Sequence, residues 1–292
     1  MAEEHKEIDV VTGTATTGHE WDGLRELNTP LPRWWLWLFY ITIIWSVGYW
    51  IVYPAWPLLS NATQGVFGYH TRSALNEDLD ALKRQRGPMM DKLASASLAE
   101  IVADPQLLDF ARAQGRVAFA DNCAPCHGAG GGGAKGYPNL NDDEWLWGGK
   151  LSDIEQTIRY GARAGDNKGR AGSMPAFGRD KILKPNEISA VADFARSLSG
   201  LSTEPGADLG LGKKVYADNC AVCHGPDGKG NREMGAPNLT DKIWLYGFDK
   251  ATIVQGIENG RGAVMPSWGG RLSEPTIKAL TVYVHTFGGG EK

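Results

Sequence analysis

Two short runs of residues combine a pair of thiols with an adjacent imidazole. They are Cys123-Ala124-Pro125-Cys126-His127 and Cys220-Ala221-Val222-Cys223-His224, and together they contain every cysteine of the chain. Two thiols three positions apart can both add to the vinyl groups of one haem, and the histidine that follows can reach its iron as the proximal ligand. The spacing predicts two covalent c-type haems, bound through Cys123, Cys126, Cys220 and Cys223, with His127 and His224 on the irons.

Other uses of a C-x-x-C pair agree less well with this sequence. A zinc site of four cysteines needs its pairs roughly 15–20 residues apart, whereas these pairs lie about 100 positions apart. A thioredoxin-like dithiol would not require a histidine directly after both pairs. Haem attachment is therefore the favoured interpretation.

The composition is that of a globular protein with room for two or three small domains. The formal net charge is −4, so the chain lacks the basic character of a nucleic-acid-binding protein and nucleic acid is not a predicted partner.

Seven of the 11 tryptophans precede residue 57. Tryptophan is enriched where a helix crosses the surfaces of a bilayer, so this clustering indicates a membrane segment.

The stretch from Trp34 to Tyr53 contains 20 consecutive residues without a charge. As a helix it would span about 30 Å, the thickness of the hydrocarbon core. Pro54 and Pro57 should end it. A cleaved signal peptide would have a shorter apolar region behind a short basic start, so residues 34–57 are predicted to be an uncleaved transmembrane anchor in the lipid bilayer.

Residues 1–33 are polar and too poor in aliphatic residues to bury a core, so alone they are predicted to be disordered. Because c-type haem is attached on the periplasmic side of bacterial membranes, the haem motifs place residues 58–292 in the periplasm. Residues 1–33 then form a cytoplasmic N-terminal segment, and the chain crosses the inner membrane once.

Residues 58–108 are predicted to be a helical linker, with two short helices broken at Gly87-Pro88 and Met89 filling an apolar contact. Residues 109–200 and 206–288 form an internal repeat around the two motifs. Matched positions include Gly115 with Gly212, Phe119 with Tyr216, Pro138 with Pro237, Met174-Pro175 with Met265-Pro266, Ala190 with Ala279, and Phe194 with Tyr283.

Each repeat resembles class I cytochrome c over its full length, so the expected fold is mostly α, with one N-terminal transmembrane helix and two tandem cytochrome c domains. In that family a methionine from a late loop is the second axial ligand. The resemblance implies this role for Met174 in the first repeat and Met265 in the second. It also implies that the carbonyls of Pro138 and Pro237 accept a hydrogen bond from the proximal histidines, which fixes the rings.

Two other side chains are rival ligands. Met234 follows His224 closely but has no counterpart in the first repeat, and His285 lies on the closing helix where the first repeat has Arg196. An iron with both histidine and methionine has no open position for a substrate. The chain is therefore expected to relay electrons and to hold no catalytic site, in contrast to a dihaem peroxidase.

Residues 9–57 resemble the N-terminal anchor of the CcoP (FixP) family, the dihaem cytochrome c subunits of cbb3-type cytochrome c oxidases. The resemblance is carried by Thr17-Gly18-His19-Glu20-Trp21-Asp22-Gly23, Pro30-Leu31-Pro32-Arg33-Trp34-Trp35 and Tyr53-Pro54-Ala55-Trp56-Pro57. It implies electron transfer from a soluble cytochrome c to the monohaem cytochrome c subunit and on to the haem–copper catalytic subunit. The alternative is a membrane-tethered dihaem relay to another periplasmic redox enzyme.

Overall fold

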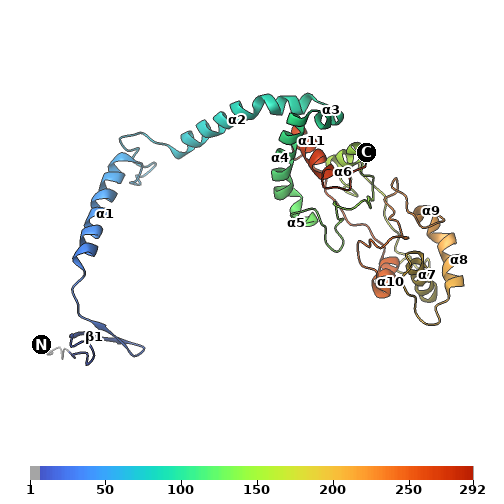
Figure 1. Ribbon diagram of the computed structural model, residues 1–292, viewed down its shortest axis with the longest axis horizontal. Helices are drawn as coiled ribbons and strands as arrows, with labels where there is room; N and C mark the ends of the chain where they lie inside the picture. Colours follow the sequence, from blue (N-terminus) through green and yellow to red (C-terminus); the bar gives the residue numbers. More distant parts are fainter. Residues whose placement is uncertain (1–6, 292) are drawn as a thin grey trace. The chain divides into compact units, whose positions relative to one another are not determined.

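The computed structural model describes residues 7–291, which form two compact units that divide between Arg84 and Gln85 (Figure 1). Residues 1–6 of the predicted N-terminal segment and Lys292 lie outside the described residues. The described chain is mostly helical, as the sequence predicted.

The first unit begins with a β-hairpin, where the sequence predicted disorder. Strand β1 (Thr16–Trp21) pairs antiparallel with β2 (Leu24–Leu27). Asp22 and Gly23 connect the strands with φ angles of 51° and 85°, the left-handed values that an Asp-Gly hairpin turn uses. The prediction of disorder is therefore wrong for residues 16–27, because the Asp-Gly turn and the strand pairing supply structure without an aliphatic core.

Helix α1 (Arg33–Val52) is the predicted apolar helix, shifted by one residue toward the N-terminus. All of its residues are at least partly exposed, and it is long and apolar enough to cross a bilayer. The segment after it folds back on its end: Val66 donates a backbone hydrogen bond of 3.0 Å to Ile51, and the rings of Trp50 and Trp56 lie 5.0 Å apart.

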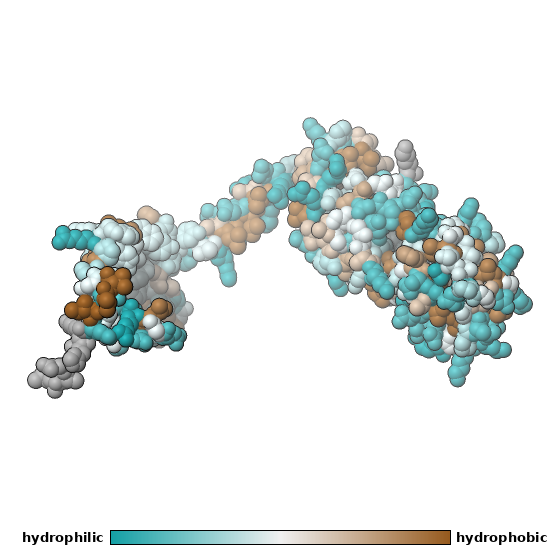
Figure 2. Space-filling view, turned by 60° about the horizontal axis from the view of Figure 1, so that its bottom comes forward, coloured by the Kyte–Doolittle hydropathy of each residue, from teal (hydrophilic) through white to brown (hydrophobic). Residues whose placement is uncertain are grey.

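Helix α2 (Thr71–Ser95) runs through Gly87-Pro88, so the predicted break there was wrong. A proline inside a helix costs about 3 kcal/mol. Packing of the last turns offsets this cost, because Leu93 is fully buried and Met89 packs beside it, as predicted for this methionine. The first half of α2 instead exposes three leucines, Leu75, Leu79 and Leu82. Figure 2 shows hydrophobic surface on this helix.

The helices of the second unit group into two lobes (Figure 1). What we call the His127 lobe contains α4 (Pro105–Asn122), α5 (Ala124–His127), α6 (Leu151–Tyr160) and α11 (Glu274–His285), with α3 (Leu98–Ala103) against α4. The His224 lobe contains α7 (Pro185–Leu198), α8 (Leu209–Asn219), α9 (Ala221–His224) and α10 (Lys250–Asn259).

Each lobe takes its closing helix from the other repeat. In the His127 lobe, α4 crosses α11 so closely that a Cβ atom on Gly115 would lie 2.5 Å from the Cβ of Tyr283. In the His224 lobe, a Cβ on Gly212 of α8 would lie 2.8 Å from the Cβ of Phe194 on α7. The sequence predicted two tandem cytochrome c domains, residues 109–200 and 206–288, and in the structure each lobe is closed by the last helix of the other repeat.

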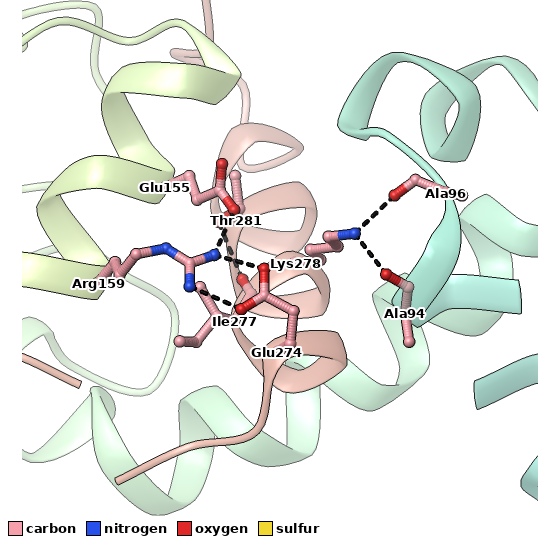
Figure 3. A network of polar contacts seen from close by, with 8 residues as sticks. All are labelled: Ala94, Ala96, Glu155, Arg159, Glu274, Ile277, Lys278 and Thr281. Atoms are coloured by element: carbon pink, nitrogen blue, oxygen red, sulfur yellow. Dashed lines mark hydrogen bonds and ion pairs between the residues drawn. The ribbon is translucent and has the colours of Figure 1, made fainter. Parts of the chain in front are cut away.

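The exchanged helix α11 is held by polar contacts with the first repeat and with the end of α2 (Figure 3). Arg159 of α6 donates two hydrogen bonds of 2.6 Å to the carboxylate of Glu274 and a third of 2.7 Å to Glu155. Lys278 donates to the carbonyl oxygens of Ala94 and Ala96, each at 2.7 Å. These contacts fix α11 on helices that precede it by more than a hundred residues.

Candidate haem-binding sites

The two cysteine motifs have the same local geometry. Each begins at the residue that ends one helix and starts a short one, with φ and ψ of −109° and −37° at Cys123 and −108° and −36° at Cys220. The following turn brings the amide of the histidine to 2.9 Å from the carbonyl oxygen of the first cysteine in both copies. None of the four cysteines is in a disulfide, and burial raises the pKa of the Cys123 and Cys220 thiols to about 11.

Both histidine rings are oriented by a proline carbonyl. Nδ1 of His127 lies 2.9 Å from the carbonyl oxygen of Pro138, and Nδ1 of His224 lies 3.0 Å from that of Pro237. This is the contact that the sequence predicted. With Nδ1 as donor, Nε2 is left as the ring atom that can bind a metal. Burial lowers the pKa of His224 although the bond to Pro237 raises it, so the neutral ring, which binds metal, is favoured.

A cavity of about 1430 Å³ lies over the second motif and is lined by Cys220, Cys223 and His224. Residues of the first repeat also line it, among them Met174, Phe177 and Val191. Phe177 and Val191 were not predicted to line this site, because the predicted first domain, residues 109–200, includes both of them together with His127.

The side chains around this cavity are suitable for a haem. They include two thiols that can bond to the vinyl groups of a haem, and an imidazole and a thioether that can bind its iron. Trp244 also lines the cavity, and its indole Nε1 is buried without a hydrogen-bond partner among the described residues. A buried donor without an acceptor is costly in a folded protein, so an acceptor on a bound group would satisfy it.

The first motif packs in the His127 lobe, whose core cluster is formed by Phe119, Ile154, Ile158, Ile277, Leu280 and Val284. Cys123 and Ala124 of the motif pack against this cluster, and so does Met265 from the second repeat. Met174 packs instead against the core of the His224 lobe, together with Cys220 and Ala221. The pairing by sequence order, Met174 with His127 and Met265 with His224, therefore differs from the placement of these side chains in space.

The rival ligands occupy different surroundings. Met234 lines the cavity near His224 but is 41% exposed. His285 lies at the end of α11, and its Nε2 is 2.9 Å from the carbonyl oxygen of Glu291. A carbonyl oxygen only accepts, so Nε2 of His285 is the donor in this contact and is not available to a metal.

Comparison with known proteins finds family matches for the N-terminal anchor segment and for each of the two repeats. Residues 13–60 match the family described as the N-terminal domain of cytochrome oxidase-cbb3, FixP, residues 112–199 match cytochrome c, and residues 207–284 match cytochrome c oxidase, cbb3-type, subunit III. The chain is 60% identical to the cbb3-type cytochrome c oxidase subunit FixP of Bradyrhizobium sp. (strain ORS 278), over 99% of both chains. It is 61% identical to FixP of Azorhizobium caulinodans, over 98% of this chain and 97% of that one.

The similarity extends to subunits with the other family name. The cbb3-type cytochrome c oxidase subunit CcoP of Azospirillum brasilense is 51% identical over 98% of this chain and 99% of its own length. With two cytochrome c segments and a complete C-x-x-C-H motif in each, the chain carries two haem c groups. It belongs to the FixP/CcoP family of cbb3-type cytochrome c oxidase subunits.

Proposed function

We propose that this chain receives electrons from a soluble cytochrome c and passes them through its two haems to the monohaem cytochrome c subunit of the oxidase. From there they reach the haem–copper subunit that reduces oxygen. The observation that carries the proposal is the presence of two haem-attachment sites in one compact unit of a cbb3 oxidase subunit.

The residues of the chain suit relay better than catalysis. When bound, each haem supplies a one-electron redox centre. The proline carbonyls hold the two imidazole rings in place, and Met174 and Met265 are the proposed second axial ligands. A histidine and a methionine on each iron leave no open position for oxygen or peroxide, and a thioether ligand raises the reduction potential.

We place α1 in the inner membrane, with residues 1–33 in the cytoplasm and the haem lobes in the periplasm. The length and apolar composition of α1 support this. The attachment of c-type haem outside the cytoplasm supports the orientation. In this arrangement the N-terminal hairpin lies where it can contact the cytoplasmic side of the other oxidase subunits.

The proposal is tested by replacing residues 1–57 with an unrelated signal anchor. A helix that only tethers the haem lobes can be replaced by any apolar helix of that length, whereas one that packs on partner helices cannot. We expect both haems to stay attached and reducible, and oxygen uptake with reduced cytochrome c to be lost together with the partner subunits in the purified complex.

A matched control keeps residues 1–33 and replaces only the apolar residues between Trp34 and Val52. It separates the contribution of the hairpin from that of the helix. Full assembly and oxygen uptake with the foreign anchor would contradict a docking role for residues 1–57 and favour the alternative, a tethered relay to another periplasmic enzyme.

A further inference from the structure

We propose that Leu75, Leu79 and Leu82 of α2 form a docking face for one helix of another oxidase subunit, a helix whose apolar stripe is flanked by carboxylates. The inference deepens the proposed function and rests on it, because it names the part of this chain that meets a partner subunit on the haem side of the membrane.

The apolar residues of α2 follow the spacing of a coiled coil. Positions alternately four and three residues apart carry leucine or methionine, with one arginine among them; they are Leu75, Leu79, Leu82, Arg86, Met89 and Leu93. This spacing places the side chains in one narrow line along a helix, the line that packs against a second helix. We call these residues the α2 seam.

Only the second half of the α2 seam is covered. Leu93 is fully buried, and Met89 packs beside it in a core cluster with residues of α3, α4 and α11. Leu75, Leu79 and Leu82 are instead 55%, 44% and 42% exposed, and Figure 2 shows hydrophobic surface on this helix. The spacing that packs against helices at one end of α2 therefore continues, largely uncovered among residues 7–291, at the other.

The position where α2 begins limits which helix can cover these leucines. Tyr69, just before α2, has its ring 5.8 Å from that of Tyr53, just after α1. Phe67 donates a backbone hydrogen bond of 3.2 Å to the carbonyl oxygen of Val52. With α1 in the bilayer, α2 starts at the membrane surface, where a partner helix that leaves the bilayer beside α1 is within reach.

Two arginines define the charge of the partner. Arg72 and Arg86 continue the spacing of the α2 seam on either side of the three leucines, and both are exposed. Two copies of this chain in one membrane would pair in parallel, so each arginine would face its own copy and the like charges would repel. A partner helix with Asp or Glu at the facing positions would attract both arginines.

The charges of α2 also argue against a lipid surface as the occupant. Helices that lie on membranes combine a broad apolar face with a polar face rich in Lys and Arg. The residues between the leucines instead include Glu77, Asp78 and Asp80, which the anionic headgroups of a membrane would repel. A narrow seam with carboxylates beside it suits a protein helix better.

The first test places the photoreactive residue p-benzoylphenylalanine at Leu79 of the full-length protein in its native membrane. The control places it at Arg84, on the opposite side of the helix. We expect the probe at Leu79 to crosslink to a helix of an oxidase subunit that carries Asp or Glu beside its apolar residues, and the probe at Arg84 to give no such product. Crosslinks from Leu79 to a second copy or to lipid alone, no crosslink, or equal crosslinks from both positions would each overturn the inference.

A second test reverses the charge within the α2 seam. Arg86→Glu should abolish the crosslink from Leu79 and release this subunit from the purified complex at lower detergent concentration, whereas Arg84→Glu should change neither property. Both haems should stay attached in both variants. Replacing the crosslinked acidic residue of the partner by lysine should restore the crosslink in Arg86→Glu. Equal behaviour of the two variants would contradict the docking face.

The outcome separates this inference from the proposed function. If oxidase subunits copurify with the unaltered chain but the probe at Leu79 does not reach them, only the docking face is wrong. If no oxidase subunit copurifies with the unaltered chain, the proposed function fails as well.

Discussion

At the scale of single residues, Arg159 joins the two repeats through ion pairs. Its guanidinium binds Glu155 on its own helix and both carboxylate oxygens of Glu274 on α11. Arg159 is 22% exposed and Glu274 is 47% exposed, so solvent weakens the pair but does not separate it. The hydrogen bonds from Arg159 hold the pKa of Glu274 below its ordinary value of 4.5.

Glu274→Gln should destabilise the second unit by about 0.5–1 kcal/mol, the range for a partly exposed ion pair with good geometry. Because the pKa of Glu274 is lower in the folded protein, its contribution is present above about pH 4.5 and is lost as the pH falls through the folded value. The difference in denaturant unfolding between wild type and variant should therefore be full at pH 7 and shrink in acid. Asp180→Asn, which breaks an exposed 3.4 Å pair with Arg179, should cause little change at either pH.

At the scale of secondary-structure elements, Gly115 and Gly212 set the distance between the crossing helices. The neighbouring Gly210 does not lie at a crossing and serves as a comparison. A methyl group at Gly212 would collide with the backbone of Ala190 and with the side chain of Phe194 on α7. Gly210, two residues earlier on the same helix, would meet its nearest neighbour, the carboxylate of Asp208, at 3.4 Å, an ordinary contact.

Gly212→Ala should therefore destabilise the second unit by about 1–3 kcal/mol, the usual range for overpacking. Gly210→Ala should be neutral or stabilising by up to about 1 kcal/mol, since alanine has the higher helix propensity. Equilibrium unfolding in denaturant gives both values. Equal effects at the two positions would contradict the close crossing of α7 and α8.

At the scale of the whole molecule, exchange makes the two haem lobes parts of one folding unit. Residues 85–291 form one compact unit, and each lobe contains helices from both repeats. Unfolding one lobe removes the closing helix of the other. Two self-contained cytochrome domains would instead unfold independently.

We expect the haem-loaded second unit to unfold in one cooperative transition. Far-ultraviolet circular dichroism and haem absorbance should give coincident denaturation curves, the standard test of two-state behaviour. Gly212→Ala should move the whole curve to lower denaturant, including the signal of the His127 haem. A biphasic curve, with only the His224 haem shifted, would show that the lobes are independent.

Local features of the chain were predictable because they depend on neighbouring residues. The apolar run after Arg33 and the contacts of His127 and His224 with the prolines follow from short patterns. The continuous helix through Pro88 was not predictable, since it depends on the burial of Leu93 against distant helices.

The exchange of the closing helices was also not predictable from the sequence, but the reason is different. The two repeats present nearly the same surfaces at the crossing, Gly115 and Phe119 in one and Gly212 and Tyr216 in the other, and the closing helices also match. By residue type alone, each closing helix, α7 or α11, could therefore pack on either α4 or α8. Only the packing of the folded chain distinguishes the two pairings.

The exchange of closing helices also has a consequence for biosynthesis. A chain emerging from the ribosome presents Cys123 and His127 early, but Met265 and α11 are among the last segments to be made. The lobe that is begun first is therefore completed last. A chain truncated before Glu274 would leave Gly115 and Phe119 of α4 uncovered, so loss of a short C-terminal segment should expose the opposite end of the haem region to proteolysis.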